Sequence, residues 1–223
     1  MRRSLVFLLT LGCWAEASLF AQTKPAVIDI PNAPVTMRVL VQSPADTVTD
    51  LQIICLFRSS PENVLRGSLA EVNAKLNGLL DRIRKPALFR GELGETLLIA
   101  PPPGSLGAKK LLLIGLGDSQ TFAPARMELV GQIVYRESSD LGVARPFFAP
   151  TILDGGFAKF GTGEVAEKVI AGLLRAQASD AVLKEANASG SRPVTGLTYL
   201  AGAANANNTR DGIERAIAAA SLK

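Results

Sequence analysis

Apolar residues along this chain follow two alternating patterns, one typical of strands and one typical of helices. Residues 96–100 and 109–115 are continuous apolar runs bounded by turn residues, a pattern that favours strands buried on both faces of a sheet. A Pro/Gly-rich turn joins the two runs, so we expect them to be neighbours in the sheet. Further strand patterns cover residues 35–41, 51–57, 147–153 and 195–201.

Helical periodicity separates these strands. The clearest helix is predicted over residues 68–85, where Ser68 and Glu71 form a capping box and Pro86 follows the last turn. Its apolar residues recur at helical spacing: Leu69, Val72, Leu76, Leu80 and Ile83. Further helices are predicted over residues 124–140, 164–178 and 209–222. Strands separated by helices predict an α/β fold with a mostly parallel or mixed sheet and helices on both faces.

The first residues have the pattern of an export signal. Arg2 and Arg3 precede a short apolar stretch, and small residues follow it, so we expect cleavage after Ala17 or Ala21. The apolar stretch is too short for an ordinary transmembrane helix. We therefore expect an exported chain, periplasmic or secreted, with no stable membrane span after cleavage. The expected segments are a signal peptide over 1–21, a flexible arm over 22–34 and a single domain over 35–223.

The amino-acid composition excludes several classes of binding partner and catalytic site. The chain has 24 Lys and Arg against 20 Asp and Glu, a net charge of +4 that is too weak and too scattered to indicate a nucleic-acid partner. It has no histidine, which excludes a Ser-His-Asp triad, a Cys-His pair and a His-ligated zinc site. We expect Cys55 to be a buried apolar residue, and we predict no catalytic residue, metal ligand or cofactor.

Carboxylates beside the strands are the remaining candidates for chemistry: Glu92, Glu95, Asp118 and Asp154. Asp118 follows Gly117 at the carboxyl end of a strand, where open α/β sheets bind ligands. A turn or helix-capping role is the alternative for Asp118, and we favour it. Glu92 and Glu95 flank a glycine turn, and we interpret them as scaffold residues.

Two loops, one rich in glycine and one rich in asparagine, contain further residues that could bind a small anionic ligand. The loop over residues 155–163 connects a strand to a helix, so backbone N–H groups at Gly155, Gly156 and Gly161 point to an anion site. Its spacing fits neither a P-loop nor a dinucleotide-binding fingerprint, and an ordinary connection is the alternative. The second loop, residues 201–208, contributes Asn205. Gly117, Asp118 and these residues form the predicted ligand-binding set.

The stretch FRGELGET at residues 89–96, followed by AKKLLLIGLG at 108–117, carries a family resemblance. It resembles the N-terminal domain of the leucyl (cytosol) aminopeptidase family, in which F-x-G-x-x-G-E, a strand and A-K-R-hydrophobic-V-G-L-G occur in this order. The helix after Gly163 resembles the corresponding family helix. The resemblance runs from residue 35 to the C-terminus and implies a macro-like, three-layer α/β/α fold.

In that family the peptidase chemistry resides in a second, C-terminal domain, which binds two metal ions and contains an N-T-D-A-E-G-R segment. We expect that domain to begin where the sequence ends, at Lys223, and neither that segment nor the metal-binding motifs occur in the sequence. No catalytic or metal-binding role is therefore carried over to any residue. We expect a non-catalytic exported module that acts in protein binding, small-ligand binding or assembly, including homo-oligomer formation.

Two alternatives remain at the sequence level. The first is a macro-like binder of nucleotides or ADP-ribose, because residues 203–205 with Asn207 and Asn208 resemble a macro-domain N-A-A-N stretch. That stretch occurs early in macro domains and late here, so we interpret Asn207, Asn208 and Thr209 as a loop and helix cap. The second alternative is an accessory subunit of a two-metal leucyl aminopeptidase.

Overall fold

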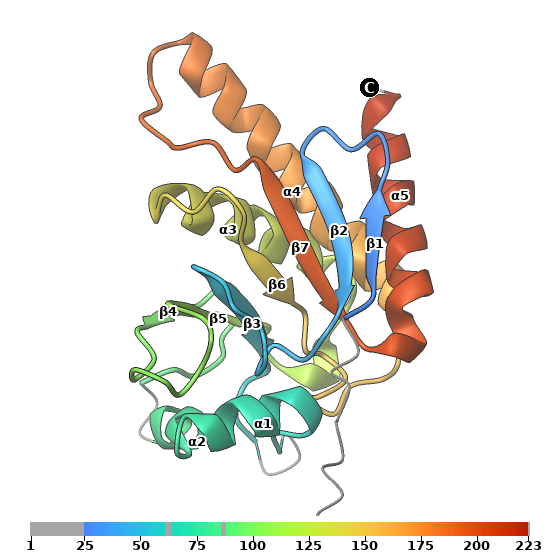
Figure 1. Ribbon diagram of the computed structural model, residues 1–223. Coiled ribbons are helices and arrows are strands. Elements are labelled where there is room, and N and C mark those ends of the chain that lie inside the picture. The colour runs from blue at the N-terminus through green and yellow to red at the C-terminus, as the bar shows by residue number, and fades with distance from the viewer. Residues whose placement is uncertain (1–24, 61–63, 86–87, 223) are drawn as a thin grey trace, which may run out of the picture.

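The computed structural model describes residues 25–60, 64–85 and 88–222, and these form a layered α/β structure (Figure 1). The described strands form one sheet in the order β1-β2-β7-β6-β3-β5-β4. The inner pairs of strands are parallel, and the outermost strands β1 and β4 each run antiparallel to their neighbour. The strands are β1 (Val27–Ile30), β2 (Thr36–Val41), β3 (Gln52–Leu56), β4 (Thr96–Ile99), β5 (Leu111–Gly115), β6 (Phe147–Ala149) and β7 (Gly196–Ala201).

Helices cover both faces of this sheet (Figure 1). One apolar core joins the sheet to α3, α4 and α5, and a second core joins the opposite face to α1 and α2. The structure therefore confirms the three-layer α/β/α fold. The helices are α1 (Gly67–Lys75), α2 (Leu79–Arg84), α3 (Arg126–Asp140), α4 (Thr162–Glu185) and α5 (Ala206–Ser221), with short 3₁₀ turns η1 (Ser119–Thr121) and η2 (Ala203–Asn205).

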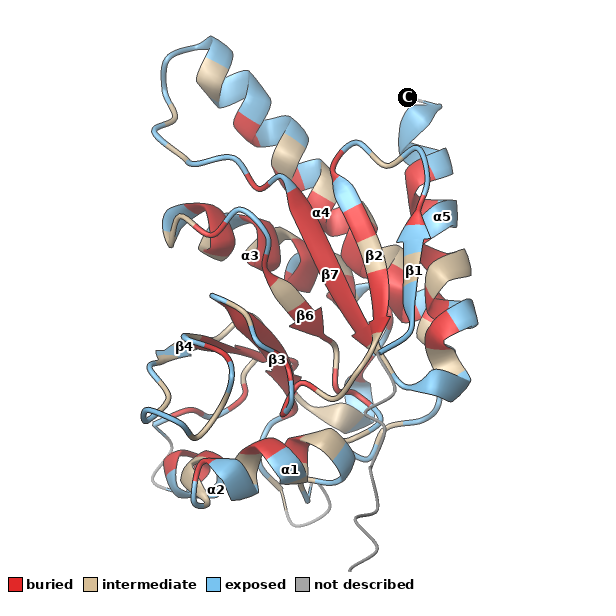
Figure 2. Ribbon diagram, viewed as in Figure 1, coloured by how far each residue is buried: buried red, intermediate tan, exposed pale blue. Residues whose placement is uncertain are grey.

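The inner strands supply both cores at once. In β3, Ile53 and Cys55 face the α3–α5 side, whereas Ile54 and Leu56 face the α1–α2 side. Strand β5 is buried at every position, as predicted, but it begins at Leu111, and Lys109 and Lys110 of the predicted run precede it (Figure 2). The same prediction was wrong for β4, where exposed and half-buried residues alternate, because this strand lies at the edge of the sheet and one of its faces meets solvent.

The helix predicted over residues 68–85 is two helices. Helix α1 ends at Lys75, and α2 begins at Leu79, because Asn77 and Gly78 adopt left-handed backbone conformations with φ of 52° and 75°. The predicted capping box was also wrong. The Ser68 hydroxyl donates to the Asp154 carboxylate instead, and the Glu71 carboxylate accepts from the Ser43 hydroxyl at 2.6 Å.

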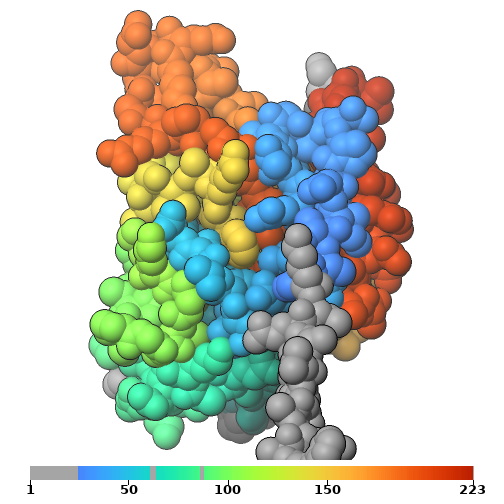
Figure 3. All heavy atoms as spheres, viewed as in Figure 1, coloured from blue at the N-terminus to red at the C-terminus, as the bar shows by residue number. Residues whose placement is uncertain are grey.

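Further boundaries differ from the sequence prediction. Residues 27–30, assigned to a flexible arm, form β1 and pair antiparallel with β2 across the turn at residues 31–35; a strand of four residues is too short for its apolar pattern to be recognised. Figure 3 shows these blue N-terminal strands packed beside the red C-terminal helix α5. Strand β6 is shorter than predicted and α4 is longer, extending to Glu185. The predicted signal peptide lies outside the described residues.

Within the described ranges, no helix combines the length and apolar character needed to cross a membrane. This holds for α4 despite its 24 residues. Its apolar side chains, including Val165, Val169 and Leu173, belong to the core beneath the sheet. Helix α4 is therefore a packed element of the domain.

Glycines bring α3 and α4 into backbone contact. A Cβ atom added to Gly131 of α3 would lie 1.9 Å from the carbonyl oxygen of Val169, and one added to Gly172 of α4 would lie 1.9 Å from that of Glu128. The partner atoms belong to the backbone, so a flexible side chain cannot move aside to make room. The separation of these two helices is thus set by residues that have no side chain.

We expect Gly131→Ala to destabilise the domain. Alanine is the better helix former by about 1 kcal/mol, but the clash with Val169 forces α3 and α4 apart, so we expect a net loss of about 2 kcal/mol. Urea denaturation of the variant measures this loss. Gly190→Ala is the control, because nothing lies within 4 Å of a Cβ atom at Gly190. A Gly131→Ala variant as stable as the wild type would contradict the close packing.

Candidate functional site

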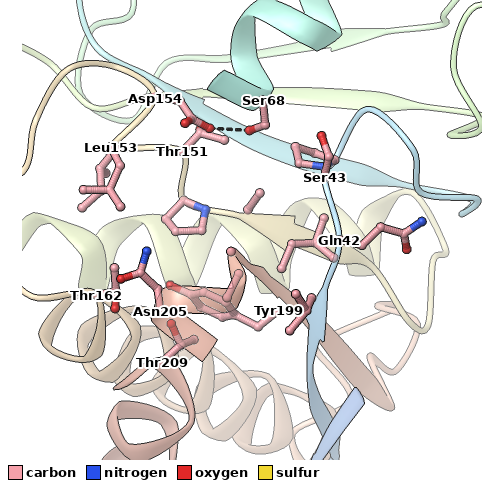
Figure 4. A pocket seen from close by; sticks show the side chains of 18 of the residues that line it. Gln42, Ser43, Ser68, Thr151, Leu153, Asp154, Thr162, Tyr199, Asn205 and Thr209 are labelled. Atoms are coloured by element: carbon pink, nitrogen blue, oxygen red, sulfur yellow. Dashed lines mark hydrogen bonds between the residues drawn. The ribbon is translucent and has the colours of Figure 1, made fainter. Parts of the chain in front are cut away.

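A cavity of about 360 Å³ opens at the carboxyl ends of β2, β6 and β7 (Figure 4). It lies between α1 on one side and the first residues of α4 and α5 on the other. Parallel strands end together at this edge of the sheet, and open α/β sheets bind ligands in the crevice outside such strand ends. We call this the strand-end cavity.

Asp154 and Ser68 form one wall of the strand-end cavity (Figure 4). The Asp154 carboxylate accepts hydrogen bonds from the Ser68 hydroxyl and from the backbone N–H groups of Ser68 and Leu69. It therefore occupies the positive N-terminal end of α1, where the first N–H groups of a helix lack intrahelical partners. Burial raises the pKa of Asp154, the nearby charge of Glu71 raises it further, and the hydrogen bonds from Ser68 and Leu69 oppose both effects.

The opposite wall consists of Tyr199, Thr162, Asn205 and Thr209 (Figure 4). Tyr199 lies on β7 and is only 1% exposed. Its hydroxyl and that of Thr162 are buried and have no hydrogen-bond partner among the described residues. Burial raises the pKa of Tyr199 well above its usual range, so the phenol keeps its proton.

Two helices begin at this second wall. Thr162 is the first residue of α4 and Asn205 directly precedes α5, and both residues line the cavity. Neither helix receives a side-chain hydrogen bond at its N-terminal cap within the described structure. Their positive ends therefore face the cavity without the internal carboxylate that α1 has.

Thr151 holds the floor of the cavity to the neighbouring strand. Its hydroxyl donates to the Cys55 carbonyl oxygen at 2.6 Å and accepts from the Cys55 N–H at 3.0 Å, which continues the pairing of β6 with β3 by side-chain bonds. The backbone at Thr151 has a φ of 48°, an uncommon conformation for a β-branched residue. Cys55 is buried as predicted, and burial raises the pKa of its thiol.

Of the residues predicted to bind a ligand, Asn205 lines the strand-end cavity and Gly161 caps α4 beside it. Asn205 is the one member of the predicted set in the cavity lining, and the other five residues lie outside it: Gly117, Asp118, Gly155, Gly156 and Gly161. Their role in binding stays a prediction. The loop after β6 is instead anchored by an aromatic cluster, in which Phe157 contacts Phe57, Phe122 and Phe160.

The scaffold roles assigned to the carboxylates agree with the structure. Asp118 accepts from the Gln120 N–H at 2.8 Å and caps the 3₁₀ turn η1, as favoured from the sequence. The Glu95 carboxylate accepts from the N–H groups of Arg90 and Glu92 and closes the glycine turn. The assignment of Asn207, Asn208 and Thr209 to a loop and cap was wrong, because α5 already begins at Ala206.

Sequence reasoning did not select Tyr199, Thr162 or Ser68. Tyr199 looked like an ordinary strand residue, and Ser68 like a helix cap. For Ser68 the sequence signal was the preceding glycine, Gly67: its φ is 48°, and a Cβ atom there would collide with the Asp154 carboxylate. Among the described residues, no three His, Cys, Asp or Glu side chains gather in a way that would hold a metal ion.

Comparison with known proteins identifies the relatives of this domain. Residues 53–187 match the model of the cytosol aminopeptidase family, N-terminal domain. The chain belongs to the cytosol aminopeptidase family. The match covers more than half of the 223 residues and confirms the resemblance recognised in the sequence.

Two curated relatives carry the description probable cytosol aminopeptidase. The protein of Thermosynechococcus vestitus is 29% identical over 102 residues, which is 44% of this chain and 20% of the relative. That of Paraburkholderia xenovorans is 36% identical over 74 residues, which is 33% of this chain and 14% of the relative. The matched segments thus span a fifth or less of these relatives.

Solved structures show the same fold at low sequence identity. A tomato leucine aminopeptidase mutant superposes with a TM-score of 0.57 at 20% identity, over 86% of this chain and 37% of that chain. An Oceanobacillus iheyensis macrodomain solved with ADP superposes with a TM-score of 0.54 at 12% identity, over 88% of this chain and 100% of that chain. The domain therefore has a macrodomain-like fold shared with an aminopeptidase.

The two tyrosines of the chain allow a matched test of the unpartnered hydroxyl. Tyr199→Phe removes a buried hydroxyl without a partner, so we expect stability to stay unchanged or to rise by up to about 1 kcal/mol. Tyr135→Phe removes a buried hydrogen bond to Asp180 of 2.9 Å, so we expect a loss of about 2 kcal/mol. Urea denaturation distinguishes the two, and a comparable loss in both variants would show that Tyr199 has a partner.

Proposed function

We propose that this domain is a non-catalytic binding module that takes up a small polar ligand in the strand-end cavity. The observation that carries the proposal is the Tyr199 hydroxyl, which is buried, protonated and without a partner among the described residues at the cavity wall. Leaving a buried donor unpaired costs about 1–3 kcal/mol, and a ligand acceptor would recover that cost. The proposal includes export of the chain, as expected from its first residues.

The shape of the cavity supports this assignment. Apolar side chains such as Ile152, Val165 and Leu200 line its body, and polar groups converge from its two walls. Small-molecule sites combine a mainly apolar lining with a few placed polar groups in this way. The alternative modes of action, protein binding and assembly with an aminopeptidase, do not require a cavity with unpaired buried hydroxyls.

A second candidate is binding of a nucleotide or ADP-ribose. It is favoured by the macrodomain-like fold, since Oceanobacillus iheyensis macrodomain structures were solved with ADP and with ADPR. The strand-end cavity lies at the edge of the sheet where such folds place ligands. This candidate uses the same cavity, so the same variants test it.

We expect a cavity-filling variant to abolish ligand binding. Gly202 lines the cavity, has an ordinary φ of −70° and has no atom within 4 Å of an added Cβ, so we expect Gly202→Phe to be accommodated without backbone strain and to obstruct the cavity. The probes are ADP, ADP-ribose and the twenty amino acids, titrated by calorimetry. At least one probe should bind, and Gly202→Phe should weaken that binding at least tenfold.

Gly190→Phe is the matched control, because it adds the same side chain in open space away from the cavity. Its affinity for the bound probe should equal that of the wild type. The proposal fails if no probe binds at millimolar concentration. It also fails if Gly202→Phe leaves the affinity unchanged, because binding would then occur elsewhere.

We also expect the purified chain to lack aminopeptidase activity. With leucine p-nitroanilide and added manganese or zinc, the release of p-nitroaniline should stay at the level of a reaction without protein. A cytosol aminopeptidase of full length provides the positive control. Turnover that co-purifies with the chain and persists through successive columns would overturn the non-catalytic assignment.

A further inference from the structure

The strand-end cavity has an acidic side. The charged residues in its lining are Glu71 and Asp154, and no described Lys or Arg lines it. Both carboxylates belong to the α1 wall: Glu71 lies one turn beyond Ser68 on α1, and Asp154 binds the first residues of that helix. Glu71 is exposed, so a group that enters the cavity can reach it. This wall attracts a cationic group.

The opposite wall attracts an anionic group. Helices α4 and α5 both begin there, and neither has a side-chain cap within the described structure. The hydroxyls of Tyr199 and Thr162 are buried at the same wall without partners, which is an independent sign of a missing acceptor or donor. Asp154 shows how α1 satisfies the same need, because its carboxylate binds the N–H groups of Ser68 and Leu69.

The volume of the cavity and the charges in its lining restrict which ligands it can bind. The cavity volume of about 360 Å³ is near the lower end of small-molecule sites, which span about 300–1,000 Å³. A diphosphate would bring two negative charges close to Asp154 and Glu71 without a basic residue from the described lining to balance them. The two walls instead complement one positive and one negative group on the same small molecule.

We propose that the strand-end cavity binds a small zwitterion of the amino-acid or short-peptide type. Its ammonium group contacts Asp154 and Glu71, its carboxylate contacts the first turns of α4 and α5 and the Tyr199 hydroxyl, and its body lies on the apolar floor. This inference rests on the proposed function and names the ligand class of the same cavity. It assigns binding and no peptide-bond chemistry.

The test titrates the full chain with leucine and dialanine, and with the N-acetyl and C-terminal amide derivatives of each. Because each wall binds one charge, we expect masking either end to weaken binding at least tenfold. Tyr199→Phe should weaken the unmasked probes about threefold or more, while leaving the protein folded. The amide derivatives, which have already lost the carboxylate, should be less sensitive to Tyr199→Phe.

Removal of the acidic charges tests the other wall. Asp154→Asn should weaken the unmasked probes at least tenfold, and Glu71→Gln, at an exposed position that is safer for folding, at least threefold. The N-acetyl derivatives lack the ammonium group and should be insensitive to Glu71→Gln. Glu185→Gln at the far end of α4 is the control for loss of one negative charge, and it should leave all affinities unchanged.

The outcomes separate this inference from the proposed function. If ADP or ADP-ribose binds in a manner sensitive to Gly202→Phe and the zwitterions do not, the proposed function stands and the zwitterion inference is wrong. If N-acetyl derivatives bind as well as the unmasked probes, the zwitterion inference is also wrong. If no probe binds, both fail.

Discussion

Burial of the inner strands on both faces is the constraint on which this domain depends. Strand β3 contributes alternate residues to two separate apolar cores, so neither face of the sheet can be left to solvent. Helices α3, α4 and α5 cover one face and α1 with α2 covers part of the other (Figure 1). Within the first of these layers, Gly131 and Gly172 bring α3 and α4 into backbone contact.

The strand-end cavity is a consequence of this layering. A parallel strand that is followed by a covering helix places the helix N-terminus at the carboxyl edge of the sheet, and α1, α4 and α5 all begin there. Three positive helix ends thus converge on one space. The chain supplies a carboxylate for the first of them, from Asp154, and the other two stay without a side-chain cap in the described structure.

Some residues at or beside the strand-end cavity could be predicted from the sequence. Gly161 and Asn205 were selected because a loop before a helix indicates an anion site, and both lie at the starts of α4 and α5. Gly117 and Asp118 follow a strand by the same logic, but β5 lies too far along the sheet to border the cavity. The strand order, which a single sequence does not reveal, decides which strand ends share the cavity.

The sequence by itself determined the family, the α/β layers and most strands, because these depend on short motifs and on local apolar periodicity. Tertiary structure decided the rest. The bond from Ser68 to Asp154 and the strand order that places β2 beside β7 depend on contacts between residues that lie far apart in the chain. The same reason hid Tyr199, since a strand residue shows its missing partner only when every neighbour is in place.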